Sequence, residues 1–440
     1  MPSQNGHPAG PRQPTRFPEI LTIAMPPIQS SSPDASPAGA SQAPARERMT
    51  RTELRASVSL ASIFALRMLG LFLILPVFAE YARNLPDGHD AQRVGLAMGI
   101  YGLMQAFLHI PLGWLSDRIG RKPVMVGGLL LFIAGGLVAA FSDTLTGIIA
   151  GRALQGMGAI SAAITACIAD LTRERHRTKA MAMVGGSIGL TFALSLVIAS
   201  PLLHSIGMAG IFGLMSVLGL VAIGVTLFLV PAPPAPHPVR LPFRKVLLNA
   251  DLARLNVGVL ALHASQVAMF MVVPAMLTDA GMPLDQHWKV YLPVVLVSFV
   301  LMLGPMMAAE RYGRVRPVLL GAVALMTAVQ LLFAAVHGLW AIVGVLLLFF
   351  VAFNVLEAMQ PSLVSRYAAA ARGAALGVYN TTQALGLFLG GAVGGWLLKH
   401  EGRSAVFVGC AAVLLLWLII AWSMKAPPAR GQEAAPAPAA

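Results

Sequence analysis

The sequence has few charged residues and very few cysteines. Asp, Glu, Lys and Arg make up 11% of its 440 residues, whereas soluble domains carry about 25%. The two cysteines, Cys167 and Cys410, both lie in apolar stretches, which argues against a disulfide framework. The sequence also lacks a nucleotide-binding glycine loop, a zinc-ligand cluster and a serine nucleophile motif, so it predicts no enzyme activity, no bound metal and no cofactor.

Long apolar stretches are what the chain has instead. Hydrophobic residues make up 57% of it, and they come in blocks of about 20, the length that a helix needs to cross a bilayer. This pattern predicts an all-α membrane protein with twelve transmembrane helices. The spans are expected at about residues 57–81, 93–114, 124–142, 145–169, 180–203, 209–230, 254–278, 289–309, 317–335, 338–364, 373–398 and 404–424.

The basic residues are unevenly placed. Most of the 31 Lys and Arg lie in the tails and in the loops on one side of the predicted spans. Because basic loops stay on the cytoplasmic side, this asymmetry predicts a multi-pass protein of a bacterial-type inner membrane with both termini in the cytoplasm. The formal net charge of +13 does not indicate nucleic-acid binding, since the bases do not gather on one face with aromatic partners.

Proline density marks a linker between two halves. Residues 231–250 contain many prolines followed by Arg244 and Lys245, and proline at this density cannot continue a helix. The N-terminal tail is rich in Pro, Ser, Ala and Gln, which predicts disorder, and Met49 is an alternative start of the chain. The predicted domains are a disordered cytoplasmic tail 1–50, a six-helix bundle 51–230, a cytoplasmic linker 231–250, a six-helix bundle 251–424 and a cytoplasmic tail 425–440.

One polar segment between the second and third predicted spans carries the clearest motif. Gly113–Lys122 reads G-x-x-x-D-R-x-G-R-K, and its charges exclude it from hydrocarbon, so it is expected to be a short aqueous loop. Glu310–Arg314 repeats part of this pattern after the second span of the other half, as expected for duplicated bundles. The simpler interpretation is a basic turn that only orients two helices. The motif residues are Gly113, Asp117, Arg118, Gly120, Arg121 and Lys122.

A few ionisable residues fall inside predicted spans, where charge is costly. Glu357 lies deepest among the 18 Asp and Glu residues, and an acid in a low-dielectric cavity suits a carrier that alternates between a proton and a cationic substrate. The alternative is a structural carboxylate paired with Arg67. Arg152 is either held by a buried partner or reaches out to the periplasmic surface. His109 and His263 are either structural residues or proton relays.

Glycines recur every four residues in two spans. Such rows let helix backbones approach closely, and they are predicted to be either static seams or surfaces along which the halves move. They are Gly386, Gly390 and Gly394 in the eleventh span, with Gly391 and Gly395 beside them, and Gly185 and Gly189 in the fifth.

Motifs in both halves together resemble one family of transporters. The resemblance is to the drug:proton antiporter branch of the major facilitator superfamily, and within it to the YajR-type efflux proteins. The segments that carry it are Leu66–Gly70, Asp117–Pro123, Gly151–Ala159, Phe350–Glu357 and Gly377–Gln383.

The resemblance implies a latch at the cytoplasmic ends of the halves. In this latch, Asp117 accepts hydrogen bonds from the start of a neighbouring helix, the eleventh, and Arg118 or Arg121 pairs with Asp170. The resemblance also implies that Arg152 takes part in proton coupling. The predicted proton-coupling residues are Arg67, Arg152, His263 and Glu357, and the predicted cavity residues are Gln155, Asn354, Tyr379, Asn380 and Gln383.

The expected function is proton-coupled efflux of small amphipathic molecules or drugs by alternating access. The expected fold has two pseudo-symmetric six-helix bundles, and the expected partners are a small-molecule substrate and the lipid bilayer. The chain is expected to act as a monomer, with a proton gradient as the energy source. Two departures leave drug antiport open, because the fifth span ends in Ser200-Pro201 instead of Gly-Pro and the first lacks a membrane acid. The alternatives are a nutrient or metabolite facilitator or symporter, and a non-transporting membrane sensor.

Overall fold

Helices make up almost all of the chain that the computed structural model describes, namely residues 48–233, 246–368 and 371–424. No β-strand occurs within these ranges. Residues 1–47 of the predicted N-terminal tail, residues 234–245 of the predicted linker and the predicted tail 425–440 lie outside the described residues. Met49–Ala440 forms one compact unit, and the description below concerns this unit alone.

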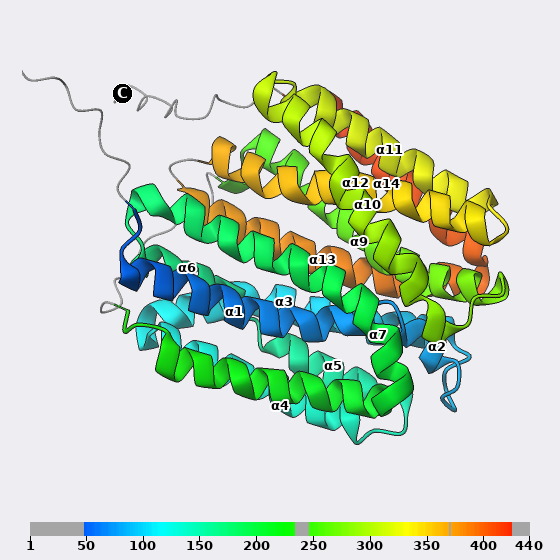
Figure 1. Ribbon diagram of the computed structural model, residues 1–440, viewed down its shortest axis with the longest axis horizontal. Helices are drawn as coiled ribbons and strands as arrows, with labels where there is room; N and C mark the ends of the chain where they lie inside the picture. The colour runs from blue at the N-terminus through cyan, green and yellow to red at the C-terminus, as the bar shows by residue number, and fades with distance from the viewer. Residues whose placement is uncertain (1–47, 234–245, 369–370, 425–440) are drawn as a thin grey trace, which may run out of the picture. The chain divides into compact units, whose positions relative to one another are not determined.

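Apart from the longer stretch between η1 and α9, the helices follow one another with short connections (Figure 1). Polar residues begin several of them: Thr50, Asp90, Thr144 and Asn249 each accept a backbone hydrogen bond at a helix start. The elements are α1 (Arg51–Ile74), α2 (Phe78–Ala82), α3 (Ala91–Ile119), α4 (Arg121–Ala140), α5 (Leu145–Met157), α6 (Ser161–Leu171), α7 (Glu174–Gly224), η1 (Val225–Leu229), α9 (Ala250–Asp279), η2 (Leu284–Gln286), α10 (Trp288–Arg311), α11 (Val315–Ala335), α12 (Leu339–Tyr367), α13 (Arg372–His400) and α14 (Arg403–Trp422).

Eleven helical stretches within the described ranges are long and apolar enough to cross a membrane. One of them is far longer than the roughly 20 residues that a span needs, because α7 continues over 51 residues across a kink. The kink lies at Gly207, whose φ of 68° is outside the helical region. The stretch therefore holds two spans, and the expected twelve are confirmed.

Some predicted bounds differ from the structure. The segment Gly113–Lys122, expected to be a loop, is almost entirely helical, because α3 continues to Ile119 and α4 begins at Arg121, which leaves Gly120 as the turn. The predicted span 57–81 begins earlier, at Arg51, and α1 ends at Ile74, where Pro76 has no N–H to donate to a further turn. The predicted continuous span 145–169 is broken into α5 and α6. A Cβ at Gly158, in the break, would lie 2.3 Å from the carbonyl oxygen of Gly128, so the backbone approaches α4 too closely for any larger residue.

The helices form two halves, and only a few pairs of helices are in contact between them. Within the first half (α1 to η1), α1 packs on α7 and α4 packs on α5. Within the second half (α9 to α14), α9 packs on α13 and α11 packs on α14. The halves meet mainly where α3 lies beside α13 and α7 lies beside α10. Gly120 (φ 101°) and Gly313 (φ 65°) make equivalent turns after the second span of each half, as the repeat predicts.

Candidate functional site

The signature motif folds into an ionic cluster around Arg121. The positive φ of Gly120 turns the chain between α3 and α4, which brings Arg121 back over the last turn of α3. Its Nη1 donates to the carboxylate of Asp117 and to Ser116 Oγ at 2.8 Å. Its Nε donates to Asp170 Oδ2, at the end of α6, at 2.9 Å. Arg121 is thus the member of the expected arginine pair that binds Asp170. We call the end of the helices where this cluster lies the signature end.

The other motif residues surround this cluster without joining it. The Arg118 guanidinium lies over the Trp114 ring, 3.8 Å from its centroid, which is a cation–π contact. Lys122 Nζ is 3.5 Å from a backbone carbonyl of η1. A Cβ at Gly113 would lie 3.2 Å from Cβ of Ala162, so the glycine allows α3 to approach α6 closely.

A second ion pair at the signature end, between a buried carboxylate and an exposed arginine, was not anticipated from the sequence. Glu53, 5% exposed, accepts hydrogen bonds from the backbone N–H of Arg173 at 2.9 Å and from its Nε at 2.8 Å. Glu53 also forms a capping box with Thr50. The pair ties the start of α1 to the α6–α7 connection, three residues beyond Asp170. The spacing of Thr50 and Glu53 is a readable capping signal, but nothing in the sequence points to Arg173.

In the first half, Arg67 and Arg152 converge on one aromatic side chain. Arg67 Nη2 donates to the hydroxyl of Tyr101 at 2.7 Å, and its Nη1 donates to Ser161 Oγ at 3.1 Å. The Arg152 guanidinium lies 5.1 Å from the centroid of the Tyr101 ring and donates to two backbone carbonyls of α3. Each arginine is 1% exposed. Arg152 is therefore held inside the protein, and the interpretation that it reaches out to a membrane surface is wrong.

Several polar atoms in this part of the first half have no hydrogen-bond partner among the described residues. They include Arg67 Nε, Arg152 Nη1, both ring nitrogens of His109 and Oε1 of Gln155. His109 is 5% exposed and Gln155 is fully buried. Buried polar groups of this kind are normally satisfied by ordered water or a ligand. The interior of the first half therefore holds several unsatisfied polar atoms beside two buried guanidinium groups.

In the second half, His263, Glu357 and Gln383 come together from three helices. His263 Nε2 lies 3.5 Å from Glu357 Oε2 and 2.6 Å from Gln383 Nε2. Its Nδ1 lies 3.0 Å from the carbonyl oxygen of Val259. A carbonyl can only accept, so Nδ1 carries a hydrogen and Nε2 is the nitrogen that faces the acid. The Glu357 side chain is 32% exposed, but its Oε2 atom, which faces His263, is buried and has no hydrogen-bond partner among the described residues.

The remaining predicted cavity residues lie around this group. Asn354, one turn before Glu357, donates to Ser298 Oγ at 3.0 Å. The hydroxyl of Tyr379 is buried and has no hydrogen-bond partner in the described part of the chain. Asn380 is half-buried on α13. The second half thus presents an acid, an imidazole and unsatisfied hydrogen-bonding groups in one region.

Two expected contacts between the halves are absent from this structure. Among the described residues the hydrogen-bond partner of Asp117 is Arg121, not the start of α13. A Cβ at Gly377, near the start of α13, would meet nothing within 4 Å, so this face of the helix is open there, although Ala374 and Ala375 beside it are buried. The proposed pair of Arg67 with Glu357 is also absent, because Arg67 binds Tyr101 and Ser161 in its own half.

The halves instead meet at the other end, where α3 begins and α13 ends, which we call the opposite end. Here α3 and α13 are in backbone contact. A Cβ at Gly95 would lie 2.1 Å from the carbonyl oxygen of Gly391, and one at Gly102 would lie 2.4 Å from that of Ala384. Gly390 has a different role, since it packs on Ala264 of α9 within the second half. The glycine row of the eleventh span therefore supplies both a static seam and a contact between halves. The prediction for Gly185 and Gly189 in the fifth span is wrong, because a Cβ at either position would meet nothing within 4 Å.

An ion pair also joins the halves at the opposite end. Lys399 Nζ donates to Asp90 Oδ2 at 2.9 Å, with side chains 41% and 31% exposed. The Lys399 ammonium holds the pKa of the Asp90 carboxyl below its usual value. Because the folded-state pKa is the lower one, the pair stabilises the protein above the unfolded pKa of about 3.9 and loses this effect as pH falls through the folded pKa.

Replacing Asp90 with Asn is expected to lower the free energy of unfolding by at most about 1 kcal/mol at neutral pH, since exposed pairs contribute little. The difference from the native chain should shrink as the pH falls below the folded pKa of Asp90. Thermal unfolding in detergent across a pH series measures it. Asp279→Asn is the matched control, because Asp279 pairs with Arg403 inside the second half. If the difference in unfolding free energy between Asp90→Asn and the native chain instead grew as the pH fell, the pairing of Asp90 with Lys399 would be contradicted.

Comparisons with known proteins agree with this geometry. A family model described as Major Facilitator Superfamily matches residues 60–309 and 257–439. The chain is 43% identical to Inner membrane transport protein YajR of Escherichia coli (strain K12) over 390 residues, which cover 87% of this chain and 86% of that protein. It is 27% identical to Multidrug resistance protein MdtH of Aeromonas hydrophila over 341 residues, which cover 74% of this chain and 82% of that protein.

A solved structure shares the fold. The crystal structure of the human organic anion transporter MFSD10 (TETRAN) superposes with a TM-score of 0.65 at 19% identity, over 84% of this chain and 100% of that chain. At this identity the likeness concerns the fold alone. The two six-helix halves, the signature cluster between the second and third spans and the sequence relatives all lead to the same assignment. This chain is a multi-pass membrane protein that belongs to the Major Facilitator Superfamily of transporters.

Proposed function

We propose that this chain exports small amphipathic molecules across a bacterial-type inner membrane in exchange for protons. The names of two relatives support export of such molecules, since one is called an inner membrane transport protein and another a multidrug resistance protein. The paired six-helix halves support alternating access, in which a site between the halves opens to one side of the membrane and then to the other.

The signature end faces the cytoplasm in this proposal. Basic residues gather at this end far more than at the other, which is the distribution expected for the cytoplasmic side. The described basic residues near the signature end include Arg51, Arg55, Arg118, Arg121, Lys122, Arg173, Arg177, Lys179, Arg254, Arg311, Arg314 and Arg316, whereas those near the opposite end are Arg83, Arg93, Lys289, Lys399 and Arg403.

The observation that carries the proposal is the contact between Glu357 and His263. The imidazole Nε2 accepts a hydrogen bond from the Gln383 amide at 2.6 Å, and Glu357 Oε2 lies 3.5 Å from the same nitrogen without a hydrogen-bond partner among the described residues. A proton on Glu357 removes the repulsion between these two acceptor atoms. The pair is therefore a site that takes up one proton and releases it when a cationic group of the substrate approaches Glu357.

The first half contributes fixed positive charge to the same mechanism. Arg67 and Arg152 are buried and have no acidic partner within 4.0 Å among the described residues. They attract the carboxylate of an acid that approaches from the second half. Movement of the halves would change this influence on Glu357, and this change couples proton binding to conformation.

The signature cluster sets the balance between the states that are open and closed at the signature end. The Asp117–Arg121–Asp170 contacts order the end of α3, and in the state closed at the signature end Asp117 would meet the start of α13.

Asp117→Asn is expected to lower the transport rate by roughly tenfold while the protein still folds, because a partly buried charge-assisted contact contributes about 1–2 kcal/mol. Initial rates in vesicles, normalised to folded protein, measure it. Arg118→Gln, which leaves the Arg121 contacts in place, is the control. An unchanged transport rate in Asp117→Asn would contradict the role of Asp117 as a latch.

The direct test uses the purified full chain in liposomes that contain a pH-sensitive dye. A panel of lipophilic amines and fluorescent amphipathic dyes is added under an imposed pH gradient. We expect at least one probe to accumulate against its gradient and to move protons in the opposite direction. Probe movement without proton movement would instead establish a facilitator, and co-directional movement a symporter. Binding without any flux would establish a sensor.

A further inference from the structure

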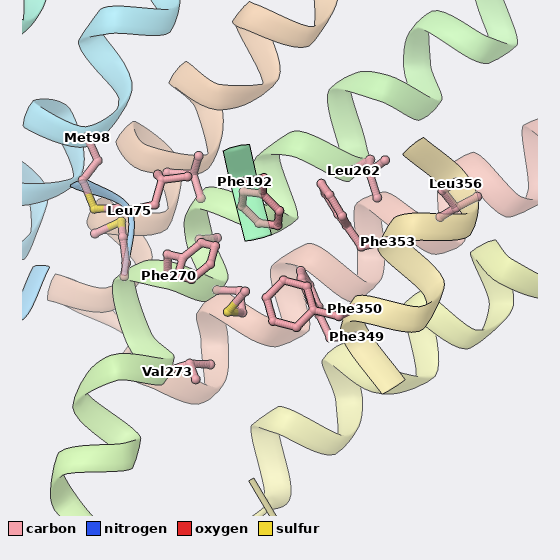
Figure 2. Close-up of a cluster of buried hydrophobic side chains, with 14 of the residues drawn as sticks. Leu75, Met98, Phe192, Leu262, Phe270, Val273, Phe349, Phe350, Phe353 and Leu356 are labelled. Carbon is pink, nitrogen blue, oxygen red and sulfur yellow. The ribbon is translucent and has the colours of Figure 1, made fainter. Parts of the chain in front are cut away.

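One aromatic side chain of the first half is inserted among rings of the second. Phe192, on the first span of α7, is 5% exposed. Its ring centroid lies 6.4 Å from that of Phe270, 6.0 Å from Phe350 and 5.9 Å from Phe353, all in the second half. Phe72 of its own half packs edge-on behind it at 5.0 Å. Figure 2 shows Phe192 facing Phe270, Phe350 and Phe353, with other apolar side chains around them.

The position of these rings along the helices decides what they separate. The helix α12 runs from the opposite end to the signature end, so Phe353 and Phe350 lie about one and two turns closer to the opposite end than Glu357 does. The helix α9 runs the other way, and Phe270 lies about two turns beyond His263 toward the opposite end. The rings therefore form a layer between the acid and the opposite end.

The contacts on either side of this layer differ. Toward the opposite end, α3 and α13 are in backbone contact at Gly95 and Gly391. Toward the signature end the packing is looser, since a Cβ at Gly377 would meet nothing within 4 Å, and the Glu357 side chain is partly exposed. Phe353 joins the two regions, since its ring centroid is 5.9 Å from that of His263.

We propose that Phe192 is an aromatic plug, which seals Glu357 from the opposite end while the halves are closed there. Interlocking rings exclude water because they fill space at the density of a protein interior. Three of the four ring contacts of Phe192 cross between the halves, so separation of the halves at this end breaks them together. The plug then leaves with the first half, and the same step exposes Phe270, Phe350 and Phe353 beside His263. The proposal goes beyond the proposed exchange of protons, because it concerns a barrier that exists whatever the substrate is.

The test measures access to one cysteine from both sides of the membrane. Cys167 and Cys410 are replaced by Ala, and Gln383→Cys places a single thiol at the level of Glu357, where Gln383 contacts His263. A membrane-impermeant maleimide is added to oriented vesicles from the signature side or from the opposite side. No substrate and no proton gradient is needed, so failure of the exchange mechanism does not affect the result.

With Phe192 present, labelling is expected to be fast from the signature side and slow from the opposite side. Phe192→Ala is expected to raise the opposite-side rate by roughly tenfold or more, since several ring contacts are lost together, and to leave the signature-side rate unchanged. Phe349→Ala is the matched control, because this buried ring packs on Phe350 and Phe353 within the second half. It should leave both rates as they are.

Three results would overturn the plug. An unchanged opposite-side rate in Phe192→Ala would mean that the glycine contact of α3 and α13 seals the path alone. A faster opposite-side rate with an equal fall from the signature side would mean that the substitution only shifts the balance between two closed states. A rise in Phe349→Ala equal to that in Phe192→Ala would assign the effect to loosening of the second half, and it would also reject the proposal.

Discussion

Replacing Glu357 with Gln is expected to abolish proton-driven accumulation of substrate. The substitution keeps the size of the side chain and its contact with His263, but the amide cannot bind and release a proton. If one proton is exchanged for each substrate, the accumulation ratio of the native chain changes by about tenfold per pH unit, because one pH unit corresponds to about 1.36 kcal/mol. This dependence should vanish in Glu357→Gln, while downhill exchange of substrate for substrate continues.

The control for this experiment is Glu401→Gln, which makes the same chemical change at an exposed position after α13. It should leave the pH dependence of accumulation as it is in the native chain. Coupling that persists in Glu357→Gln would exclude Glu357 as the proton carrier. Loss of substrate exchange as well as coupling, with normal folding, would instead place the side chain in substrate binding alone.

Replacing Gly95 with Ala is expected to open the opposite end. The added Cβ would lie 2.1 Å from the carbonyl oxygen of Gly391, and no side chain can move aside because the obstacle is backbone. Overpacking of this kind costs about 1–3 kcal/mol, so it should shift the balance of states away from closure at this end by roughly tenfold or more. The two halves should still fold, because the clash lies between them.

Cross-linking of cysteines that replace Asp90 and Lys399 by a short bis-maleimide reagent measures this closure, since the native side chains meet between the halves. In a background without Cys167 and Cys410, the cross-linking rate should fall by a similar factor in Gly95→Ala. Gly189→Ala is the control, because a Cβ at Gly189 meets nothing within 4 Å and alanine suits a helix interior better than glycine. An unchanged cross-linking rate in Gly95→Ala would show that the close approach is not required for closure.

Much of the fold was predictable because hydrocarbon imposes a simple rule on sequence. Apolar blocks of span length and the basic asymmetry specify the number of helices without any tertiary information. The length and polarity of an apolar block do not reveal a break in the helix within a span. The stretch 145–169 satisfies the rule, yet Gly158 interrupts the helix to let α4 pass, and only the neighbouring backbone reveals this need.

The candidate site was predictable in part for a similar reason. Charged residues inside spans are conspicuous, so Arg67, Arg152 and Glu357 were identified from the sequence alone. Their partners were not, because contacts between helices far apart in the chain leave no local pattern. Tyr101 and Phe192 look like ordinary core aromatics in the sequence. In the structure Tyr101 contacts two guanidinium groups, and Phe192 packs against rings of the other half.

The glycine rows illustrate the same limit at one helix. Spacing of four residues predicted close packing along the eleventh span, and the structure has it for both sets of glycines. The spacing did not distinguish Gly390, which packs on α9 in its own half, from Gly391, which meets α3 of the other half. Adjacent residues on a helix point about 100° apart, so neighbouring glycines serve different interfaces.

The most direct test of alternating access is the distance between spin labels at both ends of the same protein. One pair replaces Ile119 and Tyr312 at the signature end, and another replaces Phe141 and Trp340 at the opposite end; all four positions are exposed. The account predicts that, as pH is varied, a shorter distance at the signature end accompanies a longer distance at the opposite end. Distances that stay fixed at both ends, or that lengthen together, would contradict it.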